Sequence, residues 1–146
     1  MNPDYAARAE QELARHVTTA LENPFGFGQT LCELDRLVAG STDVVLVGDP
    51  ADARTRALAR AVFTRWLPNR TVAWLAPSDP RSREACVALA EGKLEAGGQR
   101  AASDAGTHGD PVAYVCRGRA CSGPARSAQE LTALLADAPA PVEAGA

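Results

Sequence analysis

The chain is poor in aromatic residues, and it contains no long apolar run. Aromatic residues make up only 5% of the 146 positions, so any core must be built mainly from small aliphatic side chains. No apolar stretch approaches the roughly 20 residues that a membrane-spanning helix needs. The first residues also lack the basic and then apolar layout of a secretory signal. We therefore expect a cytoplasmic protein without a membrane partner.

The chain also lacks an excess of basic residues. Its formal net charge is -3, and nucleic-acid affinity depends on lysine and arginine neutralising phosphates, so no nucleic-acid partner is expected. Arginines cluster at Arg117, Arg119 and Arg126. We interpret them as the solvated tip of a hairpin rather than as an anion site.

Common catalytic motifs are missing as well. Gly48-Asp49-Pro50 follows an apolar run and precedes a helix, but the glycines of a nucleotide-binding loop are absent and Asp49 would repel phosphate. We expect Asp49 and Asp52 to cap the helix instead. No G-x-S-x-G motif occurs. The sequence thus predicts no catalytic residue and no bound cofactor.

Residues 1–40 are predicted to form a helical hairpin. Asn2-Pro3-Asp4 is typical of a helix start, and Asn23-Pro24 of a helix end. A second helix is expected to stop at Gly40. Apolar residues recur at helical spacing in both segments: Tyr5, Ala9, Leu13, Val17, Ala20 and Leu21, then Leu31, Leu34, Leu37 and Val38.

Residues 41–136 are predicted to form a small α/β domain, followed by a disordered tail over 137–146. The continuous run 43–47 predicts a strand buried on both faces, with Val45 and Val47 on one face and Val44 and Leu46 on the other. A helix over 52–66 should turn Leu58, Val62, Phe63 and Trp66 inward. Further elements are expected as a strand at 71–75, a helix at 81–91, a loop from 92 to 110, a hairpin over 112–122 and a last helix opened by the capping box Ser127–Glu130.

The fold class is therefore α/β: a helical hairpin, then a β-α-β-α-β-β-α sandwich. This order is similar to the minimal thioredoxin fold, in which Pro111 would occupy the position of the cis-proline. The alternative is a small open parallel sheet of the flavodoxin type, which needs one more parallel strand. Fold alone settles no function in either case.

The four cysteines, at positions 32, 86, 116 and 121, do not have the pattern of a secreted disulfide framework. Cys116 and Cys121 could face each other across the predicted hairpin as a redox pair. We favour the interpretation of two small buried apolar residues, because no Cys-x-x-Cys at a helix start lowers a thiol pKa. No metal site is predicted, because His108 adds too few ligands to this pair. His16 is interpreted as a packing or surface residue.

Three motifs together resemble one family. They are Val44-Val45-Leu46-Val47-Gly48-Asp49-Pro50, Leu67-Pro68-Asn69 and the stretch from Pro111 to Pro124 that contains both Cys116 and Cys121. They are similar to the C-terminal region of thioredoxin-domain-containing proteins of the spermatogenesis-associated protein 20 (YyaL) type. The resemblance implies that an N-terminal thioredoxin-like domain and a six-hairpin glycosidase-like helical barrel, linked to carbohydrate metabolism, are missing here. It also implies that the hairpin corresponds to the last helices of the barrel. Asp35 matches a family position at the end of the barrel, and its helical spacing supports a helix-surface or capping role at least as well as a catalytic one.

Two functions follow as hypotheses. The first is a non-catalytic accessory domain that docks on a helical barrel, in cis or on a separate chain, or self-associates through its N-terminal hairpin. The second is a thiol-dependent redox module that uses Cys116 and Cys121. Neither hypothesis makes the isolated chain an enzyme of sugar or hydrolytic chemistry, because no acid and base can be paired in the sequence.

Overall fold

The computed structural model describes residues 3–85, 109–118 and 120–136. The chain divides into two compact units, one that ends at Ser41 and one that starts at Thr42. The C-terminal part of the predicted helix at 81–91, most of the loop at 92–110 and the predicted tail lie outside the described residues.

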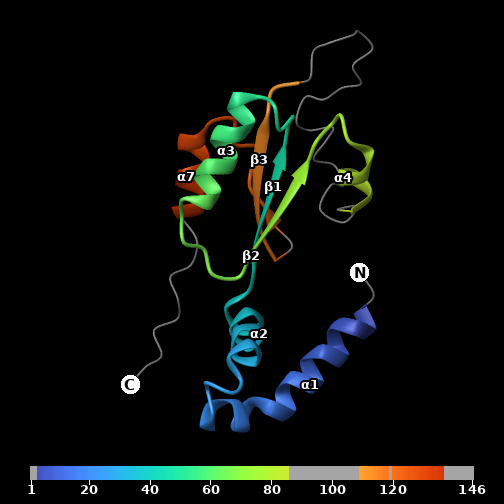
Figure 1. Cartoon of the computed structure of the whole chain (residues 1–146), viewed down its shortest axis with the longest axis vertical. Helices are drawn as coiled ribbons and strands as arrows, with labels where there is room; N and C mark the ends of the chain where they lie inside the picture. Colours follow the sequence, from blue (N-terminus) through green and yellow to red (C-terminus); the bar gives the residue numbers. More distant parts are fainter. Residues whose placement is uncertain (1–2, 86–108, 119, 137–146) are drawn as a thin grey trace. The chain divides into compact units, whose positions relative to one another are not determined.

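The first unit is a pair of packed helices, α1 (Pro3–Glu22) and α2 (Gly28–Ala39) (Figure 1). Asn23 ends α1, and its side-chain Oδ1 accepts a hydrogen bond from the Gly26 backbone N–H at 3.2 Å. Gly40, with a φ of 80°, ends α2 and donates its N–H to the Arg36 carbonyl at 3.0 Å. A positive φ at this position suits glycine, which carries no Cβ.

The second unit is built on a mixed sheet of four strands in the order β2-β1-β3-β4. Its strands are β1 (Thr42–Val47), β2 (Arg70–Leu75), β3 (Val112–Arg117) and β4 (Ala120–Cys121). β1 pairs in parallel with β2 and antiparallel with β3. The α/β class is thus confirmed, and the antiparallel β3 beside β1 contradicts the all-parallel flavodoxin-type alternative.

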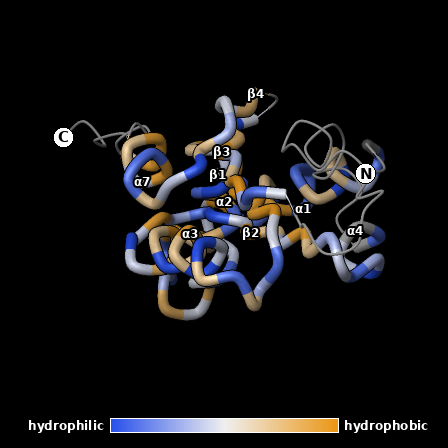
Figure 2. The backbone as a smooth tube through the Cα atoms, turned by 90° about the horizontal axis from the view of Figure 1, so that it is seen from above, coloured by the Kyte–Doolittle hydropathy of each residue, from blue (hydrophilic) through white to orange (hydrophobic). Residues whose placement is uncertain are grey.

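Helices cover both faces of this sheet. α3 (Ala53–Phe63) and α7 (Ala128–Ala136) lie on one side, and α4 (Pro80–Ala85) lies on the other, next to β2 (Figure 1). Apolar residues concentrate along the strands, whereas α3 and α7 carry both polar and apolar positions (Figure 2). This is the layering expected of a strand run that is apolar on both faces.

The core accordingly consists of two clusters separated by the sheet. Val44 and Leu46 face α3 and α7, where they pack with Leu58, Val62, Leu131 and Leu135. Val45 and Val47 belong to the cluster on the opposite face, with Leu75, Val112 and Tyr114. The predicted division of β1 between the two faces is confirmed. The alternation of side chains along a strand is its physical cause.

The predicted orientation of Phe63 and Trp66 is wrong. Phe63 is 57% exposed and Trp66 is 87% exposed, whereas Leu58 and Val62 are buried as predicted. Positions 58 and 62 are one helical turn apart on the same stripe, but position 63 lies about 100° further round the helix. Trp66 falls outside the helix, because α3 ends at Phe63 with Thr64 as its C-cap.

Pro111 also departs from expectation. None of the described residues has a cis peptide bond, so the expected cis-proline at position 111 is wrong. Pro111 is nevertheless buried. A Cβ at Gly48 would lie 2.9 Å from the Pro111 Cβ and 2.5 Å from the Thr55 Oγ1, so only glycine fits at the end of β1. The turn from β1 to α3 is therefore closely packed against the start of β3.

Candidate functional site

Cys116 and Cys121 form a disulfide across the β3–β4 hairpin. They are directly opposed in the register of the two strands. Cys116 is 3% exposed and lies in the second core cluster, whereas Cys121 is exposed. The interpretation as two separate, buried and reduced cysteines is therefore not what the structure shows. One cysteine of the pair lies in the core and the other lies at the surface.

The backbone next to this disulfide is firmly held. The Ser122 N–H donates to the Val115 carbonyl at 2.8 Å, and the Val115 N–H donates to the Ser122 Oγ at 3.1 Å. Gly118, with a φ of 58°, forms part of the turn between the strands. These contacts keep β4 against β3 beyond the two residues of the strand itself. The disulfide thus closes a short loop that hydrogen bonds already define.

Tyr114 lies on the same face of the sheet, in the same core cluster as Cys116. Its burial raises the pKa of the phenol, and the positive charge of Arg126 opposes this effect. A phenol with a raised pKa stays protonated at neutral pH, so it supplies neither a base nor a charge to the sulfurs. The Tyr114 phenol therefore does not activate Cys116.

Of the three arginines expected at the hairpin tip, the structure describes Arg117 and Arg126. Arg117 is half-buried, and its Nη2 donates to the Leu134 carbonyl of α7 at 2.9 Å. Arg126 is exposed, and Arg119 lies outside the described residues. Arg117 therefore ties β3 to α7. It is not available as part of an anion site.

The start of α3 carries a small ionic cluster. The Asp52 Oδ1 accepts from the Arg54 backbone N–H at 2.7 Å, and the Arg54 Nη2 lies 2.9 Å from the Asp52 Oδ2. These hydrogen bonds hold the pKa of Asp52 below its usual range, and they raise the pKa of Arg54. Arg54 also pairs with Asp110, and the Asp49 Oδ1 accepts from the Ala51 N–H at 2.8 Å.

The predicted capping role is thereby confirmed for Asp52, which is the N-cap of α3. Asp49 does not cap the helix, because its carboxylate accepts from Ala51 in the turn before α3. Their carboxylates occupy N–H groups that a phosphate would have to use, which argues against an anion site at this helix end. The partner Asp110 was not foreseen, because it lies 56 residues from Arg54. No local spacing in the sequence signals such a pair.

No described residues gather into a metal site. Groups of three or more His, Cys, Asp or Glu that could hold an ion are missing from the described parts of the chain. His16 is exposed, with its ring 6.4 Å from that of Phe27, as expected of a surface histidine. Cys32 is exposed with a free thiol, and Asp35 is exposed on α2. His108 and Cys86 lie outside the described residues.

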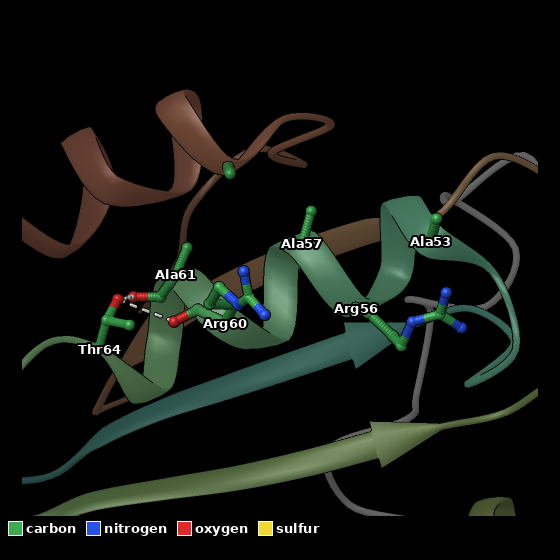
Figure 3. Close-up of a pocket in the computed structure, with 7 residues that line it drawn as sticks. Ala53, Arg56, Ala57, Arg60, Ala61 and Thr64 are labelled. Carbon is green, nitrogen blue, oxygen red and sulfur yellow. Dashed lines mark hydrogen bonds between the residues drawn. The ribbon is translucent and has the colours of Figure 1, made fainter.

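An open groove of about 500 Å³ runs between α3 and the start of α7. Ala53, Ala57, Ala61 and Ala128 line it together with Arg56, Arg60 and Thr64 (Figure 3). The Arg56 Nη1 donates to the Ala51 carbonyl at 2.6 Å, and the Thr64 hydroxyl donates to the Arg60 carbonyl at 2.8 Å. The i, i+4 spacing of the three α3 alanines was visible in the sequence, but the sequence analysis did not single it out. The residues that line the groove include no general base that could activate the Thr64 hydroxyl, and they include no acid–base pair.

Comparisons with known proteins add no relationship: no family model, no curated protein and no solved structure matches this chain. Among the described helices, none has the length and the apolar character required to cross a bilayer. The disulfide, the ionic cluster and the groove are therefore judged on their geometry alone.

Proposed function

We propose that this chain is a non-catalytic accessory domain of a thioredoxin-domain and helical-barrel protein, and that it docks on the barrel through α1 and α2. The barrel is expected in cis or on a separate chain. The observation that carries the proposal is the exposure of apolar side chains on the hairpin. Leu21 is 67%, Val38 81% and Phe25 fully exposed. We propose that these side chains belong to one apolar surface, since contiguous exposed apolar patches commonly mark interaction sites.

The chemistry of the described residues agrees with a non-catalytic role. Asp52, Arg54 and Asp110 neutralise one another at the start of α3, and the groove beside α7 has no reactive pair. Catalysis by general acid and base needs two such groups near one cavity. We infer that the isolated chain neither isomerises sugars nor hydrolyses substrates.

A thioredoxin-like fold for the second unit is part of this proposal. The mixed sheet, with β1 and β2 parallel and β3 and β4 antiparallel, supports it. The trans peptide bond before Pro111 is a departure from that fold. The loop between β1 and α3 has no cysteine either, so a thioredoxin-like unit of this kind would lack the redox motif at its helix start.

The variant Leu21→Glu/Val38→Glu tests whether the hairpin mediates association. It changes two exposed positions and leaves the contact between α1 and α2 in place. Light scattering at micromolar concentration reports association of the full chain. We expect the wild type to form larger assemblies than the double variant, with far-UV circular dichroism unchanged. Gln11→Glu/Thr18→Glu is the matched control, since it adds the same charge at exposed polar positions of α1. A monomeric wild type whose stability the stripe variant Leu13→Glu/Val17→Glu leaves unchanged contradicts the docking proposal.

A second candidate function is a thiol-dependent redox module, and the Cys116–Cys121 disulfide favours it. We expect the protein in the cytoplasm, where disulfides are usually transient and serve catalysis or redox sensing. A permanent structural disulfide would be unusual there. Cys121 is the exposed residue of the pair, so we expect a dissolved thiol to attack its sulfur rather than that of the buried Cys116.

This second function is tested by insulin reduction with dithiothreitol as the electron source. A rate above background that Cys116→Ser abolishes supports the redox module and overturns the non-catalytic assignment. Cys32→Ser is the control, because Cys32 is exposed and outside the disulfide. Background rates for all three proteins contradict the redox module and leave the docking proposal intact.

A further inference from the structure

β2 forms one border of the described sheet, and its backbone groups point alternately toward β1 and away from it. The Thr42 N–H donates to the Asn69 carbonyl at 3.1 Å, and the Gly48 N–H donates to the Leu75 carbonyl at 3.0 Å. In a parallel ladder, residues that bond to the neighbouring strand alternate with residues that do not. The odd-numbered residues of β2 are therefore bonded to β1, and the even-numbered ones direct their N–H and C=O groups outward.

Three successive even-numbered residues of β2 leave their outward backbone N–H and C=O groups unpaired within the described part of the chain. Among the residues that the structure describes, the backbone groups of Arg70, Val72 and Trp74 have no hydrogen-bond partner on this side. The next outward residue, Ala76, is satisfied, because its N–H donates to the Ser82 Oγ and its carbonyl accepts from the same hydroxyl, both at 3.1 Å. The open edge thus ends where Ser82 of α4 covers it.

We propose that two copies of this chain pair antiparallel along β2, so that their two sheets join into one. The twofold axis passes beside Val72, which then faces its own symmetry mate. Arg70 faces Trp74 of the second copy, and Trp74 faces Arg70. Each of these pairs consists of outward residues, so each exchanges two N–H···O=C hydrogen bonds. Such an interface is isologous and closed, as in most soluble dimers.

In the proposed register, the residues at both ends of the β2 edge are compatible with those that face them in the second copy. In this register the residue opposite Ala76 is Pro68, which has no N–H to leave unpaired. The ladder therefore stops at the same point on both sides. Arg70 is the only charged residue of β2, and it meets an indole rather than another arginine. Like charges directly opposite would have destabilised the pairing.

The side chains around this edge are arranged for the Arg70–Trp74 pair. The Arg70 guanidinium lies 5.1 Å from the centre of the exposed Phe63 ring, and its Nη1 donates to the Arg65 carbonyl at 3.1 Å. The Trp74 Nε1 donates to the Gly48 carbonyl at 3.0 Å. Both side chains are thus held in place before association. A guanidinium opposite an indole ring adds a cation–π contact to the backbone bonds.

Hydrogen exchange of the full chain, resolved by residue, tests the pairing directly. At high micromolar concentration we expect protection of the amides of Arg70, Val72 and Trp74, and a dimer mass in light scattering. On dilution these amides should lose protection, while those of Thr71 and Ala73, which bond to β1, keep it. Fast exchange at Arg70, Val72 and Trp74 at every concentration, with a monomer mass, overturns the proposal.

Two variants separate this edge from other interfaces. Val72→Pro removes only an outward N–H, since proline is tolerated on the open side of an edge strand, and it should give a monomer that keeps its protected odd-numbered amides. Thr71→Lys places an exposed charge at the edge and should also weaken the dimer. Gln129→Lys on α7 adds the same charge elsewhere and should leave the dimer unchanged. A dimer that survives Val72→Pro and Thr71→Lys but is lost in Leu21→Glu/Val38→Glu overturns the β2 interface and supports the hairpin.

Discussion

The helical hairpin and the α/β unit use similar apolar residues to different effect. Among residues 4–41, whose burial the structure describes, only Ala20 is buried, and α2 has no buried residue. In β1, by contrast, Val44 through Val47 are all 0% exposed. The difference follows from the number of neighbours. A helix in a pair has one partner to cover its stripe, whereas a central strand has covered faces on both sides.

This contrast shows that a segment can form regular secondary structure without forming a buried core. The hairpin forms well-defined helices because spacing and turn residues favour them locally. Most helical stability in proteins, however, comes from packing of the apolar face. We therefore expect the α/β unit to carry the cooperative stability of the chain. Both tryptophans, Trp66 and Trp74, lie in that unit, so their fluorescence reports on it without a contribution from the hairpin.

The largest expected effect is that of Val45→Asp. It places a charge in a fully buried position without a partner, and we expect a loss of more than about 4 kcal/mol in the free energy of unfolding. The matched change Val38→Asp lies at an 81% exposed position of α2 and should stay within about 0.5 kcal/mol. Urea unfolding followed by tryptophan fluorescence measures the loss at Val45, and far-UV circular dichroism, to which the hairpin helices contribute, measures the loss at Val38. Equal losses would show that the two regions do not differ in the way described.

Truncation of a core leucine comes next. Leu58→Ala on α3 should cost about 2–5 kcal/mol, because the cavity beneath the helix cannot fully collapse. Leu21→Ala removes the same atoms from a 67% exposed position on α1 and should cost less than about 0.5 kcal/mol. The same unfolding curves, together with far-UV circular dichroism for the hairpin, give both values. A larger loss at Leu21 would indicate that the hairpin is part of the cooperative core.

A smaller effect is expected from Cys121→Ser. The disulfide closes a loop with a sequence separation of 5, and the chain-entropy relation assigns about 2 kcal/mol to a loop of this size. Cys32→Ser on α2 removes an exposed free thiol and should have no measurable effect on stability. Thermal unfolding without reductant compares the two variants. If the wild type loses no stability when dithiothreitol is added, the disulfide does not stabilise this unit.

The smallest effect concerns pH and the start of α3. The hydrogen bonds from Arg54 hold the pKa of Asp52 below its usual range. The native state therefore favours the carboxylate, and this contribution is complete above the ordinary aspartate pKa and lost as the pH falls through the lowered value. Asp52→Asn keeps the capping oxygen and should remove this part of the acid dependence. Carboxyl chemical shifts against pH measure it, and a normal pKa for Asp52 would contradict the assignment.

The sequence alone was sufficient for the elements whose causes are local. The apolar run at 43–47 predicted a strand covered on both faces, because a half-exposed strand would have alternated with polar residues. The capping roles of Asp52 and Ser127 were also correct, since a cap needs only the next three residues. In the structure, Ser127 Oγ accepts from the Glu130 N–H at 3.2 Å, while the Glu130 carboxylate accepts from Arg126 at 2.8 Å. The second bond differs by one residue from the expected capping box.

Errors arose where a residue's surroundings come from distant parts of the chain. Phe63 and Trp66 were expected to face the core because they are large and apolar, but α3 ends at Phe63 and its buried stripe passes through Leu58 and Val62. The pairing of Arg54 with Asp110 is likewise tertiary, because it joins the start of α3 to the segment before β3.

The disulfide depends on both the local sequence and the tertiary structure. A separation of five residues around a glycine indicated that Cys116 and Cys121 could face each other across a hairpin, but the interpretation favoured from the sequence, two small buried apolar residues, was wrong. Whether the two sulfurs are buried depended on the sheet. β4 is an edge strand of two residues, so Cys121 remains at the surface, while Cys116 lies in β3 beneath a covered face. Spacing along a chain determines which residues can meet. Only the stacking of layers decides which of them stays in contact with water, because burial is a property of neighbours that the local sequence does not contain.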